Sequence, residues 1–100
     1  MVWNVYSIHA TVWLYPGMAG WHFVTLPKKQ AKEIKKTFGG RKRGWGSLPV
    51  EVTIGKTSWQ TSIFPDKKTQ SYLLPLKAEV RKKEGITDGD IIVLKIEIKL

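Results

Sequence analysis

The stretch from Leu74 to Leu100 constrains the fold of this chain more than any other part. After a tight turn at Asp88-Gly89-Asp90 it ends in a run where apolar and charged side chains alternate. One side of that run consists of Ile92, Leu94, Ile96, Ile98 and Leu100, and the other contains Lys95, Glu97 and Lys99. A period of two predicts a β-strand with one face in a core and the other in water.

The N-terminal segment has the same period, and its apolar face is expected to consist of Val2, Tyr6, Ile8, Ala10, Val12 and Leu14. Turn residues at Pro16-Gly17 follow it. Four more segments have the character of strands: Trp21–Leu26, Leu48–Ile54, Thr57–Phe64 and Ser71–Leu76. Six short strands predict a mainly β fold, a small closed or nearly closed barrel, because closure removes unpaired strand edges.

Two segments break this pattern and predict helices. Between Lys28 and Phe38, the apolar residues Ala31, Ile34 and Phe38 have the spacing of one helix face, and lysines occupy most of the other positions. Two glycines follow and are expected to end this helix. A second, short helix is expected over Lys77–Glu84. The barrel is therefore expected to carry one amphipathic basic helix and one short helix.

Composition is consistent with one domain over residues 1–100. The chain is 42% apolar and 25% charged, which is enough to bury a core without staples. Cysteine is absent, which excludes disulfides, thiolate metal sites and a cysteine nucleophile. The N-terminus has neither a basic start nor an apolar run long enough to span a bilayer. We expect a cytoplasmic protein with no membrane partner.

The net charge of +9 is concentrated in one segment. All eight cations of the first fifty residues lie between Lys28 and Arg43, with Glu33 as the single acid. Such a patch attracts phosphate-bearing partners, and a nearby tryptophan can stack on a base. The candidate residues for binding an anion or nucleic acid are Lys28, Lys29, Lys32, Lys35, Lys36, Arg41, Lys42, Arg43 and Trp45. The alternatives are a solvated helix that keeps the protein soluble, and a Trp45 that folds back over the barrel mouth.

A second candidate site is a pocket at the barrel mouth. The tryptophans and tyrosines exceed what the core requires, so some are expected to form an apolar ligand surface, although core packing is the default for most. The candidate pocket consists of Trp21, His22, Trp59, Lys77 and Arg81. Arg81 is the main candidate for holding an anion. Alternatively, Arg81 pairs with Asp88 or Asp90 and holds the final turn.

Metal and catalytic signatures are weak. His9 and His22 are the only imidazoles and are expected to be neighbours across the first hairpin, but no carboxylate lies at ligand spacing and zinc needs about three protein ligands. Gly39 and Gly44 have the spacing of a phosphate loop, yet Trp45 stands where its lysine is required. We expect no metal, no cofactor and no enzymatic activity.

Three ordered blocks of the chain resemble a known family. They read W-x-F-V-x-L-P (Trp21–Pro27), V-x-V-x-I-G-x-T-x-W-x-T-S-I-F-P (Val50–Pro65) and Y-L-L-P-L-K-x-x-V-R-K-x-x-G-I-x-x-G-D (Tyr72–Asp90). With the basic helix between the first two, they resemble the bacterial domain of unknown function 1905 family. The resemblance implies a small six-stranded β-barrel whose function is not established.

The last block also looks like part of the AbrB and MazE type of swapped-hairpin DNA-binding domain, to which Gly85, Gly89 and Asp90 correspond. That similarity covers this block alone, and those domains lack the N-terminal hairpin and the basic helix. Dimeric DNA binding therefore does not carry over to this chain.

The residues favour a non-enzymatic binding module that takes an anionic partner, either nucleic acid or a nucleotide-like ligand, through the basic helix and loop. One alternative is a small molecule held at the tryptophan-lined mouth. Another is an interaction or stability module whose contact surface is Trp3, Val5 and Trp13 on the outer face of the first strand. A monomer and a homodimer are both compatible with these patterns.

Overall fold

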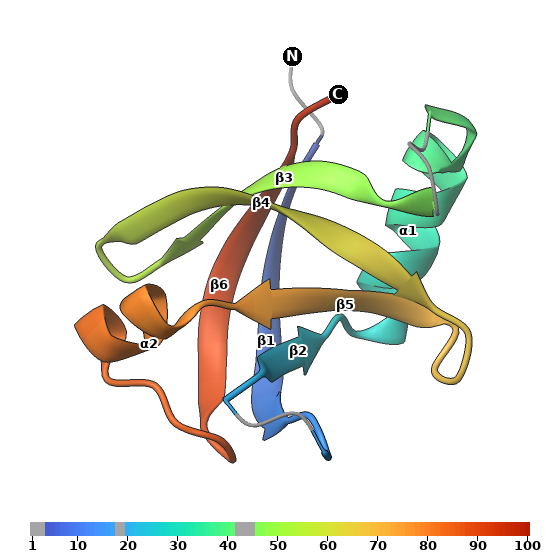
Figure 1. The fold of residues 1–100 in the computed structure, drawn as a ribbon. Helices are drawn as coiled ribbons and strands as arrows, with labels where there is room; N and C mark the ends of the chain where they lie inside the picture. The colour runs from blue at the N-terminus through green and yellow to red at the C-terminus, as the bar shows by residue number, and fades with distance from the viewer. Residues whose placement is uncertain (1–3, 18–19, 42–45) are drawn as a thin grey trace.

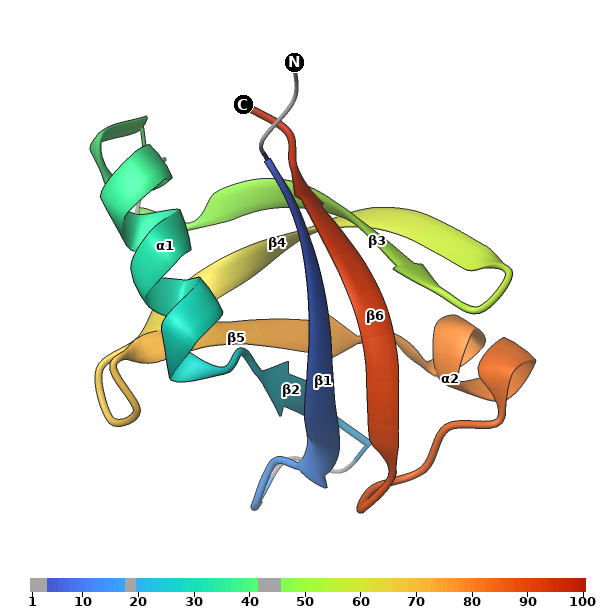
Figure 2. The ribbon, with the colours of Figure 1, turned by 180° about the vertical axis from the view of Figure 1, so that it is seen from behind.

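A computed structural model describes residues 4–17, 20–41 and 46–100. Its elements are β1 (Val5–Leu14), β2 (His22–Thr25), α1 (Lys28–Phe38), η1 (Gly39–Arg41), β3 (Leu48–Ile54), β4 (Thr57–Asp66), β5 (Ser71–Leu76), α2 (Ala78–Glu84) and β6 (Ile91–Ile98). The prediction of a mainly β barrel is confirmed, because six antiparallel strands close in the order β1-β2-β5-β4-β3-β6. The two helices lie at opposite sides of the barrel (Figures 1 and 2).

Burial follows the alternation of the sequence. The four even-numbered residues of β3 and the four of β6 are all buried in the core. Two residues assigned to the apolar faces are exposed instead: Leu14 at 46% and Leu100 at 45%. Leu14 is the last residue of β1, and Leu100 lies beyond the end of β6, so neither has a barrel interior to face.

The core is almost entirely aliphatic. Of the described tryptophans and tyrosines only Tyr72 is buried, while Tyr6 and Trp59 are partly buried and pack against the core. Core packing, the default expected for most of these aromatics, does not hold for the exposed Tyr15 and Trp21. Trp13 and Phe23 lie opposite each other on β1 and β2, on the face away from the buried valines. With Tyr15 and Trp21 they form an outer cluster whose neighbouring ring centroids are 5.3 to 6.0 Å apart.

Helix α1 closes one side of the barrel and has the predicted bounds. It buries Ala31, Ile34 and Phe38, and its lysines remain outside. Burial of side chains as large as Ile34 and Phe38 contributes about 1.5–3 kcal/mol each. Lys35 and Lys36 in the last turn complement the negative end of the helix dipole. The basic surface of α1 is thus held in place by its apolar stripe.

The barrel wall is incompletely paired between β4 and β5. Their pairing consists of Phe64↔Leu73, Pro65↔Tyr72 and Asp66↔Ser71. From Ile63 back to Thr57, the pairs described for β4 are with β3 alone, while β5 continues beside β2 as far as Leu76. The two strands therefore diverge, and α2 follows β5 away from the barrel (Figure 1).

Candidate functional site

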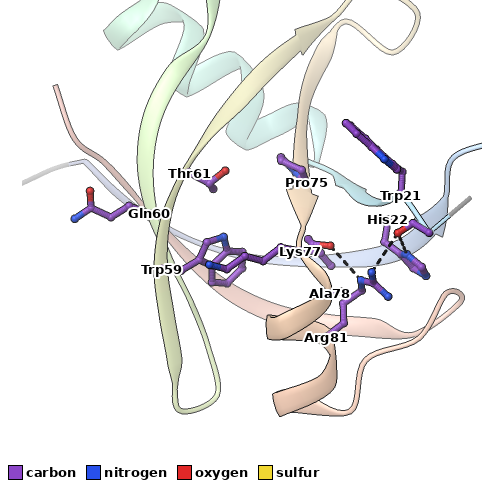
Figure 3. A pocket seen from close by; sticks show the side chains of 11 residues that line it. Trp21, His22, Trp59, Gln60, Thr61, Pro75, Lys77, Ala78 and Arg81 are labelled. Carbon is purple, nitrogen blue, oxygen red and sulfur yellow. Dashed lines mark hydrogen bonds between the residues drawn. The ribbon is translucent and has the colours of Figure 1, made fainter. Parts of the chain in front are cut away.

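A cleft of about 500 Å³ lies where β4 and β5 diverge. This volume is within the range of about 300–1,000 Å³ that is typical of ligand pockets. Its walls come from the start of β2, the middle of β4, the end of β5 and the first turns of α2 (Figure 3). The lining residues are Gly20, Trp21, His22, Trp59, Gln60, Thr61, Pro75, Leu76, Lys77, Ala78 and Arg81.

The fold brings together all five residues of the pocket proposed from sequence. Trp21 and His22 form one wall, Trp59 stands across from them on β4, and Lys77 and Arg81 lie at the α2 end. Gly20, Gln60, Thr61, Pro75, Leu76 and Ala78 were not anticipated. Most of these contribute backbone or small apolar surface, which has no recognisable sequence signature.

Arg81 is fixed by backbone carbonyl groups. Its Nε donates to the carbonyl oxygen of Leu76 at 3.1 Å, and its Nη2 donates to that of Gly20, also at 3.1 Å. The anticipated ion pair between Arg81 and Asp88 or Asp90 is absent from the described contacts, since Asp90 accepts instead from the Thr87 amide at 2.8 Å. The guanidinium is therefore held at the cleft with its positive charge uncompensated by a carboxylate.

His22 is oriented by the same carbonyl group. Its Nδ1 lies 2.9 Å from the oxygen of Gly20, and because a carbonyl only accepts, Nδ1 carries the hydrogen. In the neutral ring Nε2 is then left as an acceptor.

The expectation that His9 and His22 are neighbours is wrong. His22 pairs with Leu14, whereas His9 pairs with Val93 on β6, because β2 joins only the last three residues of β1. Within the described residues no three His, Asp or Glu side chains converge on a metal position.

The cleft combines apolar walls with positive charge. Trp21 is 53% exposed, whereas Trp59 is half-buried against the core. No acidic residue is among the described lining residues. The ammonium of Lys77 lies 3.7 Å from Glu79, but both groups are solvent-exposed, so this pair is weak. The arrangement suits a ligand with an apolar or planar portion and an anionic group.

The basic residues of α1 form a separate surface. All five lysines of the helix are exposed, as predicted for a solvated face. Beside them, a depression of about 570 Å³ is lined by Ala31, Lys32, Lys35, Pro65, Asp66, Lys67, Gln70, Ser71 and Tyr72. Lys67 was not among the candidates from sequence. Lys42, Arg43, Trp45 and the side chain of Arg41 lie outside the described residues.

Two tyrosines between α1 and the barrel have altered acidity. Burial raises the pKa of Tyr72 above its ordinary value. The pKa of Tyr6 is raised as well, first by burial and then by the negative charge of Glu33, against a hydrogen bond with Thr37 that lowers it. Neither phenol is therefore disposed to act as a base near neutral pH.

Over the part of the chain that the structure describes, no helix has the length and apolar character needed to cross a membrane.

Comparison with known proteins assigns a family to the chain. No curated protein matches the sequence. The model of one family, described as a domain of unknown function (DUF1905), matches residues 9–96, which include most of β1 and every later strand up to Ile96. The chain belongs to the DUF1905 family.

Proposed function

We propose that this domain is a non-enzymatic binding module whose ligand occupies the cleft between β4 and β5. The ligand has an apolar or planar portion for the tryptophans and an anionic group for the cations. The observation that carries the proposal is the convergence of Trp21, Trp59, Lys77 and Arg81 from separate segments on one cleft.

Fixed geometry supports this assignment. Two carbonyl groups hold the guanidinium of Arg81 before any ligand arrives, so little side-chain entropy is lost on binding. Trp59 rests against the core and offers a firm apolar surface, while Trp21 is exposed on the opposite wall. The positive charge of Arg81, whose described partners are carbonyl groups and not carboxylates, selects for anions.

A thermal-shift screen against nucleotides, sugar phosphates and small carboxylic acids tests the proposal. At least one compound is expected to raise Tm, by an amount that grows with its concentration. Lys77→Gln and Arg81→Gln are each expected to lower the affinity for that compound about tenfold or more, because each removes a charged hydrogen-bond donor. Lys82→Gln is the matched control, because Lys82 is an exposed cation of the same helix outside the cleft. A panel with no stabilising compound, or equal weakening by Lys82→Gln, contradicts the proposal.

A second candidate function is salt-dependent binding of nucleic acid by α1. The favouring observation is that none of the five lysines of α1 forms a salt bridge among the described residues, and Lys67 adds a further cation beside Lys32 and Lys35. A row of unpaired lysines is suited to phosphates and carries no sequence preference.

Titration of labelled single- and double-stranded DNA and RNA at several salt concentrations tests this second function. The triple variant Lys32→Gln, Lys35→Gln, Lys36→Gln is expected to flatten the slope of log K against log salt by about 2 for a single strand, since each lost phosphate contact removes about 0.7. The control is the triple variant Lys82→Gln, Lys83→Gln, Lys95→Gln, because these three lysines are exposed but lie outside α1. Affinity that does not depend on salt, or equal effects of both triple variants, rules this function out.

A further inference from the structure

The unpaired part of β4 presents backbone hydrogen-bonding groups to the cleft. The amide of Lys99 donates to the carbonyl oxygen of Pro49 at 2.9 Å, so Pro49 faces β6. In antiparallel sheets the residues of a strand alternate in the side to which they bond. Since Pro49 lies opposite Ser62, the residues of β4 that bond to β3 are Thr57, Trp59, Thr61 and Ile63. The peptide groups of Ser58, Gln60 and Ser62 point away from β3, toward β5.

The facing edge of β5 can satisfy few of these groups. The amide of Leu26 donates to the carbonyl oxygen of Tyr72, so Tyr72, Leu74 and Leu76 bond on the β2 side. Leu73 and Pro75 point toward β4, and Leu73 is already opposite Phe64. Pro75 has no N–H to offer. One edge of the cleft is therefore an open strand with donors and acceptors, and the other offers little to pair with it.

We propose that the ligand of the cleft is the carboxyl terminus of an extended peptide, which adds to the free edge of β4 as a short antiparallel strand. This inference rests on the proposed function and names its ligand class. Strand addition uses main-chain hydrogen bonds for affinity and alternate side-chain pockets for selection.

The ends of the cleft favour a chain terminus. At one end the strands are joined at Phe64↔Leu73, and at the other Thr57 donates to Glu84 of α2 at 2.6 Å. The free edge from Ser58 to Ser62 is about 14 Å long at about 3.4 Å per residue. A few residues fill this length, so a peptide that lies along it ends inside the cleft.

Charge sets the direction of the peptide. If the register of Phe64↔Leu73 is continued, Lys77 falls at the level of Gln60, and Arg81 follows on α2. Both cations line the cleft, and no carboxylate is among its described lining residues. A terminal carboxylate at this end makes the peptide antiparallel to β4. Trp59 and Leu76 face it from the barrel side and select an apolar side chain.

Two pools of short acetylated peptides with randomised last three residues provide the probe. One pool ends in a free carboxylate and the other in an amide. We expect the domain to enrich members of the free-carboxylate pool with an apolar side chain, and Lys77→Gln to abolish that enrichment. Enrichment of neither pool, or of both equally, overturns the inference. If metabolites bind while neither pool is enriched, the proposed function stands and this inference fails.

Amide hydrogen exchange on the domain with a selected peptide tests strand addition itself. Slower exchange is expected at Ser58, Gln60 and Ser62, while Trp59 and Thr61, which already bond to β3, remain unchanged. Protection confined to Arg81 and Lys77, without alternation along β4, overturns strand addition.

The backbone contact of Gln60 offers a matched pair of variants. Gln60→Pro removes an N–H that does not bond to β3, and it is expected to lower the affinity for the peptide about 3- to 10-fold. Gln60→Ala keeps this N–H and is expected to leave the affinity unchanged. N-methylation of successive peptide residues leaves the protein intact, and loss of binding at alternate positions is the expected result. Equal tolerance of every N-methyl group contradicts a bound strand.

Discussion

The Nη2 atom of Arg81 lies 3.1 Å from the carbonyl oxygen of Gly20, so one side chain joins α2 to the segment that enters β2. The same carbonyl oxygen is 2.9 Å from Nδ1 of His22. Side chains from α2 and from the start of β2 thus meet at one backbone oxygen, on the wall of the cleft opposite β4. Arg81 also donates to the carbonyl oxygen of Leu76, so the same side chain links the end of β5 to this wall.

Replacement of Arg81 by Gln is expected to lower the free energy of unfolding by about 1–2 kcal/mol, because two hydrogen bonds from a charged donor are lost. Urea unfolding measures the change. Lys82→Gln, on the exposed face of the same helix, is expected to change stability by about 0.5 kcal/mol or less. Equal effects of the two substitutions would show that the carbonyl contacts of Arg81 do not stabilise the fold.

The turn between β3 and β4 is coupled to α2 through Glu84. Its carboxylate accepts a hydrogen bond from Thr57 at 2.6 Å and lies where a Cβ on Gly55 would be placed. Gly55→Ala is therefore expected to displace the Glu84 carboxylate and to weaken its hydrogen bond with Thr57.

Thermal unfolding of Gly55→Ala, Thr57→Val and the double variant measures this coupling. The double variant is expected to lose less stability than the sum of the single changes, by about 0.5 kcal/mol or more, since both act on the position of Glu84. Strict additivity of the two single changes contradicts the assigned contact.

The sequence predicts the elements of this fold well and their contacts less well. Alternation in β6 identifies the strand and its buried face, since period two follows directly from strand geometry. It fails at Leu100 and Leu14, which have the right period but lie at ends where no core remains to cover them. Burial at strand ends depends on the closure of the barrel, which no local pattern contains.

Contacts between distant segments account for the remaining misses. The bond between Arg81 and Gly20 joins residues 61 positions apart, and an acid closer in sequence was the expected partner. His9 and His22 are separated because the hairpin register leaves most of β1 to β6. The gap between β4 and β5 has one local signal, Pro75, whose missing N–H makes it unsuited to paired strands on both sides.

Stability is expected to fall at alkaline pH because of Tyr72. Burial raises the pKa of this phenol in the folded state above the ordinary tyrosine value of about 10. As pH rises, the unfolded chain therefore releases this proton before the folded chain does. Above pH 10 the unfolded chain binds fewer protons than the folded chain, so the free energy of unfolding decreases with rising pH. This contribution is fully present below pH 10.

Urea unfolding between pH 8 and 11 checks this dependence. Tyr72→Phe is expected to change stability little near neutral pH and to flatten the alkaline decline. The exposed Tyr15→Phe is the control and is expected to leave the decline as it is. If the free energy of unfolding of Tyr72→Phe decreased at alkaline pH as much as that of the unmodified protein, groups other than Tyr72 would cause the decrease.

The two faces of β6 are expected to respond differently to truncation. Ile96 is fully buried, and Ile96→Ala is expected to cost about 2–5 kcal/mol through lost burial and a residual cavity. Val93 is 56% exposed, and Val93→Ala is expected to cost about 1 kcal/mol or less. Thermal unfolding compares them, and similar losses would contradict the assignment of β6 faces.

Binding in the cleft is tested by NMR titration of the ¹⁵N-labelled domain with the strongest binder from the metabolite or peptide panels. Shifts are predicted at the indole N–H of Trp59, the amide of Gln60 and the Nε–H of Arg81, with the amides of α1 unchanged. Shifts confined to α1, or a domain that binds no member of any panel, would contradict the assignment of the cleft as the binding site.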